Sequence, residues 1–489
     1  MTIAQEKSTA NAGNIRDFRI SSRKTNRQRD LSGGIAEVRY YESVLSNNVT
    51  LSAAVVETGF SKEGGQESFA EGTIDWLPIR GGERCDIILE DSQPEPNQLI
   101  LGSGGSGGSD LPIDGMYVNR LRGAQPGTQK DVYFVDFCSK EHFDNDLTRV
   151  HKRYDGMIAE SVKEIVEEVL EGTWAEGDGV DGKDIDATAV PYNFIGCDKK
   201  PFYVCTWLAS KSVPSGGETE IGGAAGYFFY QTRDGFHFRS IDKIFEEGNR
   251  QRDNRDVVKR FIFNNTGKPV PGYDANIVNY ELDSAVDLNE KLTLGSYNNR
   301  TIFFDFYAMN YEIRDYNILD QEDKIATAGT DFDNVAEDFT ESPSRLMCHI
   351  LDVGTLASGE NAEEQLEQQR EDPEKPTFDA PDVMVQSIMR YNQLFTVKTT
   401  IMIPGDFSIR AGDVIRCDFP ELKGGDNAGR NPQSGGIYMV AEVCHRMTSR
   451  ECYTSMTLIR DSFGSTSPVQ SSSSSSRAGA AVNNDVLFF

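Results

Sequence analysis

The sequence has few cysteines, few histidines and no long apolar run. Its 489 residues include 8 Cys and 5 His, and no two cysteines form a CxxC pair, so we expect neither a disulfide scaffold nor a zinc cluster. No stretch approaches the ~18 consecutive apolar residues of a membrane-spanning helix, and residues 1–17 lack the apolar core of a signal peptide. We therefore predict a protein without a membrane span, made and kept in a cytoplasm-like compartment. Most cysteines are expected to pack as small buried hydrophobes, with a metal or disulfide role as the alternative.

Positive charge is also scarce. Lys and Arg number 49 against 77 Asp and Glu, a formal net charge of −28. Because phosphate binding needs a basic surface, this balance argues against a general nucleic-acid or acidic-membrane binder. At roughly 150 residues per domain, the length corresponds to about three domains with separate cores.

Recognisable catalytic and cofactor motifs are missing as well. The sequence holds no HExxH, P-loop or zinc-deaminase motif. Residues 102–108 formally match the dinucleotide fingerprint and the nucleophile elbow, but both chemistries require a helix directly after the turn, and residues 109–115 cannot start one cleanly. The aspartates of 178–186 lack the spacing of an EF-hand loop, which favours a solvated acidic loop. We therefore expect a protein that is not an enzyme and that needs no cofactor or metal.

The sequence does contain a β-rich pattern with a few helices. Short runs with β-branched enrichment, bounded by Gly, Asn and Asp, predict strands between 35 and 138. Apolar residues at i, i+4, i+7, i+8 and i+11 predict a helix over 157–170. Further helices are predicted over 201–214 and 381–395, and a hairpin over 227–241. The predicted fold class is β-rich α+β.

These patterns divide the chain into six segments. The first is basic and rich in Gly, Ser and Asn, and we expect either a disordered leader or an arm that docks on an acidic neighbour. An acidic stretch at 358–376 favours a solvated linker or an exposed helix. The segments are a basic N-terminal arm (1–33), a first β domain (34–150), a helical or mixed domain (151–224), a second β domain (225–265 with 380–465), an inserted mixed domain with the acidic linker (266–379) and a Ser-rich tail (466–489).

An internal repeat links the two β domains. The run Ile79, Arg80, Gly81, Gly82, Glu83, followed by Arg84-Cys85-Asp86, resembles Ile409-Arg410-Ala411-Gly412-Asp413, followed shortly by Arg416-Cys417-Asp418. Downstream runs at 133–138 and 438–444 match as well. Chance similarity between short β motifs is the alternative, but order and local chemistry agree twice. We therefore predict that the two turns occupy equivalent places in two superimposable β domains.

The residues from Leu394 to Asp461 carry a family resemblance. An alternating strand reaches the turn Pro404-Gly405, and an apolar-x-x-Gly-Asp turn that ends in Gly412 and Asp413 leads into the next strand. This block resembles the barrel signature of phage tail hub proteins. The order of segments over 35–475 is similar to that of the baseplate central hub subunit of contractile-tailed, T-even-like bacteriophages.

That resemblance implies two related β-barrel, tube-type domains with helical or mixed domains inserted, in a homotrimeric ring of six similar units. It also implies a place in the virion tail baseplate, after assembly in the host cytoplasm. The implied partners are a six-fold tail tube or tube-initiator protein, a three-fold central spike protein that carries a lysozyme in several such phages, and the tape measure protein. DNA would pass through the lumen without specific binding, and an acidic lining would repel its phosphates.

The chain departs from that family pattern in its basic arm, its acidic 320–376 stretch and its final residues. The apolar residues Val486, Leu487, Phe488 and Phe489 follow a serine run, and we predict that they dock in a groove on a neighbouring subunit or on the spike. Three other classes remain as alternatives: a tail-fibre or carbohydrate-binding adhesin component, a β-scaffold hydrolase, and the related injection hub of bacterial secretion systems.

Overall fold

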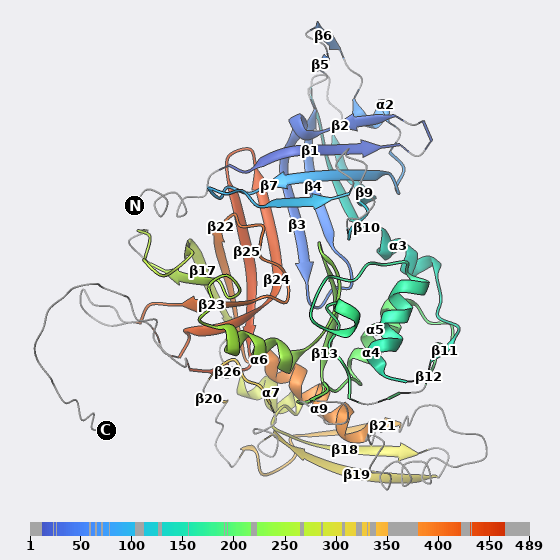
Figure 1. Ribbon diagram of the computed structural model, residues 1–489, viewed down its shortest axis with the longest axis vertical. Coiled ribbons are helices and arrows are strands. Elements are labelled where there is room, and N and C mark those ends of the chain that lie inside the picture. Colours follow the sequence, from blue (N-terminus) through green and yellow to red (C-terminus); the bar gives the residue numbers. More distant parts are fainter. Residues whose placement is uncertain are drawn as a thin grey trace, which may run out of the picture.

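The computed structural model describes most of residues 12–350 and 380–464. Gaps lie at 23, 26, 58–59, 64–65, 70–71, 78, 103–111, 126–129, 155, 190, 193, 217–222, 265–267, 285–286, 306–308, 319–324, 330, 333–338, 422–430 and 432. The acidic linker and the C-terminal Val486, Leu487, Phe488 and Phe489 lie outside the described residues. Strands dominate and helices are interspersed among them, which confirms the predicted β-rich α+β class (Figure 1).

The first β unit, residues 12–139, begins earlier than predicted. The sequence places residues 1–33 in a basic arm outside any core, but Phe18 and Ile20 on the first strand are fully buried and this strand pairs with residues 84–90. Apolar and charged residues alternate along it, so one face enters the core while the other stays in solvent. The elements of this unit are β1 (Asn14–Ser21), β2 (Gln28–Asp30), η1 (Ser32–Gly34), β3 (Ile35–Ser43), β4 (Thr50–Glu57), β5 (Phe60–Glu63), β6 (Gln66–Phe69), α2 (Thr73–Trp76), β7 (Arg84–Glu90), β8 (Gln98–Leu101), β9 (Met116–Gln125) and β10 (Asp131–Ser139).

The second β unit, residues 260–284 with 397–461, is composed differently from the predicted segment. Residues 275–284, predicted within the insertion, pair with two strands of this unit. The hairpin at 227–240, predicted within this unit, pairs only with itself among the described strands. The strands are β15 (Arg260–Phe263), β16 (Ala275–Ile277), β17 (Asn279–Ser284), β22 (Val397–Pro404), β23 (Val414–Asp418), β24 (Gly436–Thr448) and β25 (Cys452–Arg460).

The two β units share one strand order. Hydrogen-bonded neighbours run β3-β4-β10-β9-β7 in the first unit and β17-β22-β25-β24-β23 in the second, antiparallel throughout. In each unit the strand that precedes this series along the chain is short and pairs with the unit's first strand. In the first unit β2 pairs with β1, and in the second β16 pairs with β15. The units differ at that first strand, because β1 is antiparallel to β7 whereas β15 is parallel to β23.

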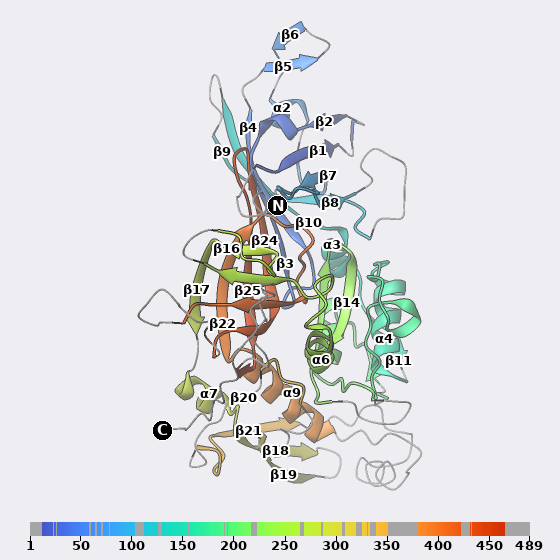
Figure 2. The ribbon, with the colours of Figure 1, turned by 60° about the vertical axis from the view of Figure 1, so that its left-hand side comes forward.

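One long strand joins the units. The first part of β24 pairs with β23, and its second part, 442–448, pairs antiparallel with 37–43 of β3. The result is a continuous antiparallel sheet in the order β17-β22-β25-β24-β3-β4-β10-β9, which we call the joined sheet. Figure 1 shows β17 and β9 towards opposite sides of the molecule, and Figure 2 shows the helices α4 and α6 on one side of this sheet.

The helical unit, residues 140–251, confirms three predictions. The helix expected over 157–170 is present, the helix expected from Pro201 begins there but ends at Ala209, and the expected hairpin forms. Stacked rings of Phe229 and Phe236, 5.4 Å apart, hold the hairpin in the core of this unit. The elements are α3 (Lys140–Leu147), β11 (Arg153–Tyr154), α4 (Ile158–Glu164), η2 (Ile165–Val169), η3 (Val180–Gly182), β12 (Phe194–Ile195), α5 (Pro201–Ala209), β13 (Tyr227–Thr232), β14 (Gly235–Ser240) and α6 (Ile241–Gln251).

The inserted unit carries a small sheet, β19-β18-β21, and ends in the helix that the sequence predicts near 381–395. Its elements, with the last described strand, which pairs with it, are α7 (Leu288–Leu294), β18 (Asn298–Asp305), β19 (Asn310–Asn317), β20 (Asp331–Phe332), β21 (Arg345–Ile350), α9 (Ala380–Leu394) and β26 (Ser462–Phe463). Among the described helices, none has the length and apolar character needed to cross a bilayer. Five of the eight cysteines are buried.

Candidate functional site

The joined sheet has a packed face and a solvent face because its residues alternate. On β3, Val38 and Tyr40 are fully buried, whereas Glu37 and Arg39 lie on the opposite face. Directly opposite residues of neighbouring strands share a face, so this solvent face can be followed across the sheet. We call it the polar face. Its charged residues, from β17 to β9, are Glu281, Asp283, Lys398, Glu442, Arg446, Glu37, Arg39, Asp136, Arg120 and Arg122.

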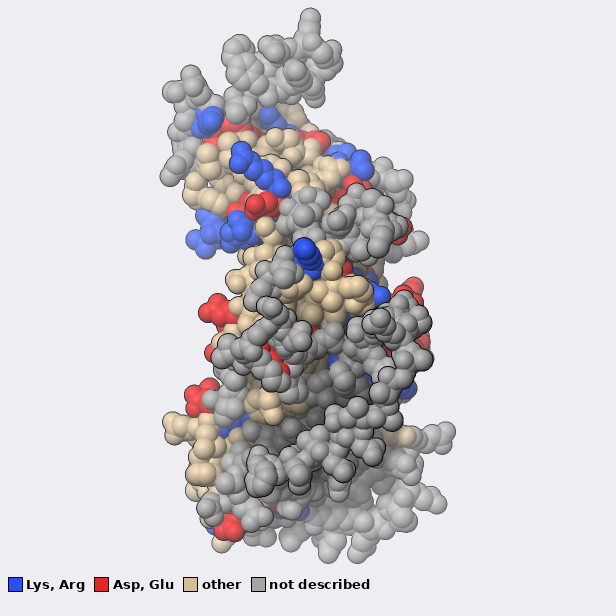
Figure 3. Space-filling model, turned by 90° about the vertical axis from the view of Figure 1, so that its left-hand side faces the viewer, with Lys and Arg blue, Asp and Glu red and all other residues tan. Residues whose placement is uncertain are grey.

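The polar face is not acidic. Five of its charged residues are basic and five are acidic, although the whole chain carries −28. The expectation that an acidic lining repels phosphate therefore does not describe this face. Figure 3 shows the side of the molecule that lies at the left in Figure 1. On this side Lys and Arg lie mostly over the upper half, with Asp and Glu interspersed.

Carboxylates pair with most arginines of the polar face. Glu37 accepts hydrogen bonds from Nε of Arg39 at 2.7 Å and from Nε of Arg446 at 2.6 Å. Asp136 accepts two from Arg122, at 2.6 and 2.8 Å. Burial raises the pKa of each carboxyl, but the arginine hydrogen bonds outweigh burial, and the pKa of Glu37 and that of Asp136 are both lowered. Both groups therefore stay ionised and neutralise the arginines beside them.

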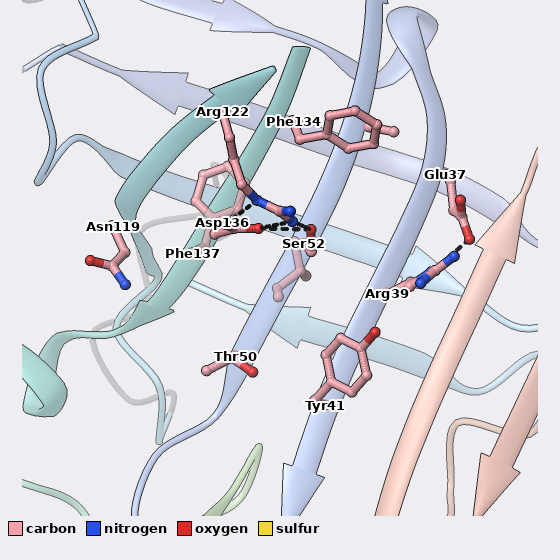
Figure 4. Close-up of a pocket in the computed structure, with 12 residues that line it drawn as sticks. Glu37, Arg39, Tyr41, Thr50, Ser52, Asn119, Arg122, Phe134, Asp136 and Phe137 are labelled. Atoms are coloured by element: carbon pink, nitrogen blue, oxygen red, sulfur yellow. Dashed lines mark hydrogen bonds and ion pairs between the residues drawn. The ribbon is translucent and has the colours of Figure 1, made fainter. Parts of the chain in front are cut away.

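A hollow of about 420 Å³ lies on this face between β3, β4, β9 and β10 (Figure 4). Figure 4 shows Arg122 directed towards Asp136 and Ser52, with the Glu37–Arg39 pair at the edge of the hollow. The hollow therefore offers little uncompensated charge to a phosphate.

The same backbone hydrogen bonds hold both repeat turns. Gly82 N–H donates to the carbonyl of Val118 on β9 at 2.7 Å, and Gly412 N–H donates to the carbonyl of Val440 on β24 at 2.8 Å. The residue after each glycine accepts a return bond from the same valine, at 2.9 and 2.8 Å. Both glycines have positive φ, 78° and 89°. The internal repeat in the sequence aligns residues 438–444 of β24 with residues 133–138, which lie on β10. The turn contacts instead make β9 the counterpart of β24.

A carboxylate closes each turn. Glu83 accepts the backbone N–H groups of Arg80 and Gly81, both at 2.8 Å. Asp413 accepts that of Arg410, also at 2.8 Å. The acidic residue that the two runs share thus has the same local task in both β units.

The strand beyond each turn contact carries a β-bulge at the same place. The β9–β10 register shifts at Asn119 and the β24–β25 register shifts at Ala441, in each case one residue after the valine that contacts the turn. Ile79 and Ile409, which open the two runs, both pack against the core of their own unit.

The turn Pro404-Gly405 lies at the contact between the two β units. Gln93 of the first unit donates from Nε2 to the Gly405 carbonyl at 2.8 Å. A Cβ at Gly405 would lie 2.3 Å from Sγ of Cys452, so this close approach requires glycine. Pro404 ends β22 opposite Tyr453. The turn residues that the sequence singles out therefore act in packing the units together.

Glu42 is a buried carboxylate at the same contact that the sequence analysis missed. It accepts hydrogen bonds from the Tyr40 hydroxyl at 2.9 Å, from Arg233 N–H at 2.9 Å and from Ala411 N–H at 3.1 Å. Burial raises its pKa, and the two backbone donors oppose that rise. One side chain thus ties β3 to the hairpin of the helical unit and to the turn before Gly412.

His445 lies buried beside the contact between the two β units. Because of this burial, we expect the protein to lose stability in acid. Its Nδ1 lies 3.0 Å from Thr454 Oγ1 and its Nε2 lies 3.1 Å from the Ile409 carbonyl. Burial disfavours the imidazolium and lowers the pKa of His445 from 6.5 to about 3. Below pH 6.5 the unfolded chain therefore binds a proton that the folded chain refuses, and the free energy of unfolding falls by about 1.4 kcal/mol per pH unit.

The variant His445→Gln cannot take up that proton. Between pH 6.5 and pH 4.5 its urea unfolding free energy should fall by about 2.3 kcal/mol less than that of the unmodified protein. The matched control is His151→Gln, because the side chain of His151 is 71% exposed. Equal pH dependence of His445→Gln and the unmodified protein would contradict the prediction.

A hydroxyl, an imidazole and a carboxylate lie in line near the hairpin β13–β14. Thr232 Oγ1 is 2.8 Å from His237 Nε2, and His237 Nδ1 is 2.5 Å from Asp184 Oδ2. Activated nucleophiles use such a set, so it bears on the hydrolase alternative. Thr232 has no exposed surface, however, and Asp184 also pairs with Arg239 at 2.8 Å. The set acts here as a buried hydrogen-bond network that ties the hairpin to the loop of Asp184.

No protein-family model and no curated protein matches the chain. Several solved structures are similar to it. The tail protein from Neisseria meningitidis MC58 has 10% identity and a TM-score of 0.47, over 93% of this chain and 97% of that one. The 43 kDa tail protein of prophage MuSo2 from Shewanella oneidensis has 8% identity and a TM-score of 0.45, over 91% and 98%. A chain of the Francisella PdpA-VgrG complex has 7% identity and a TM-score of 0.43, over 93% of this chain and 53% of that one.

Prophage tail proteins, related to the class that the 394–461 block resembles, thus recur among the solved structures to which this chain is similar. TM-scores below 0.5 do not transfer the role of any residue. Those roles follow from this chain's own geometry.

Proposed function

We propose that the chain is the hub subunit of a phage tail baseplate, in which each of three copies contributes two β barrels to a ring of six similar units. The observation that carries the proposal is the shared strand order, turn and bulge of the two β units. Three copies of a twofold internal repeat form a pseudo-six-fold ring. Such a ring fits a six-fold tail tube on one side and a three-fold spike on the other.

Closure of each β unit into a barrel is supported by the chain segments that bridge its ends. In the first unit β2 pairs with β1 and the chain then continues into β3, which pairs with β4. In the second, β16 pairs with β15 and the next strand, β17, pairs with β22. Each segment therefore connects the first strand of its unit back to the far side of the same sheet.

The polar face is the proposed lining of the channel. The cores of both β units lie on the other side of the joined sheet, while helices α6 and α9 pack on Met439 and Ile459 at one end of the polar side. A ring closed through this sheet would place the barrels outside and the rest of the polar face inside. DNA then meets arginines that are already paired with carboxylates, and it passes without specific binding because few phosphate contacts are available.

Removing two of the pairing carboxylates should turn this face into a DNA-binding surface. The variant Glu37→Gln with Asp136→Asn should retard duplex DNA in a gel at 50 mM salt and lose it as salt rises, whereas the unmodified protein should not retard it. The control Asp181→Asn with Asp315→Asn removes the same charge from exposed ion pairs elsewhere. Equal DNA retardation by both variants, or by neither, would overturn the proposed lining.

The proposed partners are the central spike protein, the tail tube or tube-initiator protein and the tape measure protein, within the virion tail baseplate. Native mass measurement of the purified chain, alone and with the spike, tests the proposal. Three copies per particle are expected, with three spike chains bound. A monomer throughout the micromolar range in both samples would overturn it.

A further inference from the structure

The junction between the two β units is complete inside one chain, and its counterpart is open. β24 pairs with β25 on one edge and with both β23 and β3 on the other. Its counterpart β9 pairs with β7 only through Met116 and Tyr117, and from Asn119 onward β10 is its one strand partner within the described residues. In the same way β3 pairs on both edges, whereas the described part of β17 pairs with β22 alone.

Burial along β17 shows the effect of the missing neighbour. Val118 and Val440, which contact the two turns, are equivalent positions of the two β units. When the strand pairing is followed from each valine to the edge of its unit, Leu282 occupies the position of Tyr40 on β3, and Tyr280 that of Val38. Tyr40 and Val38 are fully buried, but Leu282 is 52% and Tyr280 37% exposed. Exposed apolar side chains on an unpaired strand edge are a liability that proteins cover.

The two open edges carry opposite charge. The exposed part of β9 has Arg120 and Arg122, while β17 has Glu281 and Asp283. Because like charges on neighbouring strands oppose pairing, this difference disfavours a β9–β9 or a β17–β17 contact. A second copy of this chain supplies the edge that each strand lacks.

We propose that β9 of one subunit pairs antiparallel with β17 of the next copy, repeating the β24–β3 junction between subunits. Strand directions agree, because strands alternate along the joined sheet and leave β9 antiparallel to β17. In the β24–β3 junction Cys444 lies opposite Tyr41. The strand pairing makes Arg122 on β9 the equivalent of Cys444, and Ser284 on β17 the equivalent of Tyr41. The proposed joint therefore places Arg122 opposite Ser284 of the neighbour. A head-to-tail contact of this kind closes a ring. The inference rests on the proposed ring and specifies the joint that closes it.

Disulfide trapping tests this register. The variant Arg122→Cys with Ser284→Cys is made in a background in which the exposed Cys197 and Cys348 are serine. Opposite residues of antiparallel strands have Cα atoms roughly 4.5–5.5 Å apart, within disulfide reach. The control, Arg122→Cys with Asn279→Cys, displaces the second cysteine by about 13 Å along the strand. After mild oxidation, non-reducing gel electrophoresis shows which chains are covalently linked, and native mass measurement gives the number of chains per particle.

We expect the first variant to run as a covalent trimer that dithiothreitol returns to single chains, and the control to stay single. A particle of three chains in which the first variant links no better than the control would overturn the β9–β17 joint and leave the proposed hub intact. Single chains by native mass for the unmodified protein, both alone and with the spike, would overturn both.

Discussion

Arg390→Met is expected to lower the free energy of unfolding by about 3–5 kcal/mol, the largest effect of any single substitution considered. Arg390 on α9 is 1% exposed and donates to Asp242 at 2.9 Å, to Asp461 at 2.6 Å and to the Ala326 carbonyl at 2.7 Å. Methionine removes the cation but leaves two buried carboxylates facing each other. Urea unfolding followed by circular dichroism, with the first transition compared, measures the loss.

The control for that variant is Arg300→Met. Arg300 pairs with Asp315 at 2.5 Å, but both side chains are about half exposed, so water replaces the lost partner and the loss of stability should be far smaller than for Arg390→Met. Adding Asp242→Asn and Asp461→Asn to Arg390→Met should recover part of the stability, because the buried charges are then gone. Equal losses from Arg390→Met and Arg300→Met would show that the buried network does not hold α9 in place.

Local periodicity and turn chemistry could be predicted from the sequence. The helix over 157–170 has an apolar face at helical spacing, and the hairpin at 227–240 has two apolar runs around a short turn. The glycines of the repeat turns are needed for backbone conformation, and such requirements are visible in a single sequence. For these elements the determinants lie within a few residues of one another.

Pairings between distant segments could not be predicted in the same way. Residues 14–21 contain two arginines and a few apolar residues, and only the partner strand β7 shows that Phe18 and Ile20 enter a core. The strands at 275–277 and 279–284 are too short to carry a clear alternation. Their place in the second β unit depends on β15 and β22, which lie on either side of a long insertion.

The polar face shows why net charge is a poor guide to one surface. The chain carries −28, but five basic and five acidic side chains lie on this face. A local signal does exist in residues 35–43, IAEVRYYES, where charged residues alternate with apolar ones. Alternation reports a strand with one solvent face, whereas the sum of charges over 489 residues reports only the average.

Gly412→Ala should cost about 2–5 kcal/mol, because a backbone cost and a packing cost add. Gly412 has φ of 89°, where a Cβ costs roughly 1–2 kcal/mol. That Cβ would also lie 2.1 Å from the hydroxyl oxygen of the buried Tyr230, an overlap of the kind that costs about 1–3 kcal/mol in a packed core. The midpoint of urea unfolding should therefore fall clearly at unchanged slope.

Two variants separate these costs. Gly81 has φ of 99°, but a Cβ there meets nothing nearer than the Val118 carbonyl at 3.9 Å, so Gly81→Ala should show the backbone cost alone. Adding Tyr230→Phe to Gly412→Ala removes the hydroxyl and should recover part of the packing cost, though not all, since the ring carbon that carried it would still lie 2.8 Å away. Equal losses in Gly412→Ala and Gly81→Ala would mean that the second turn does not pack tightly on the helical unit. A larger loss in Gly412→Ala, relieved by Tyr230→Phe, would show that the turn at Gly412 packs tightly on Tyr230 of the helical unit.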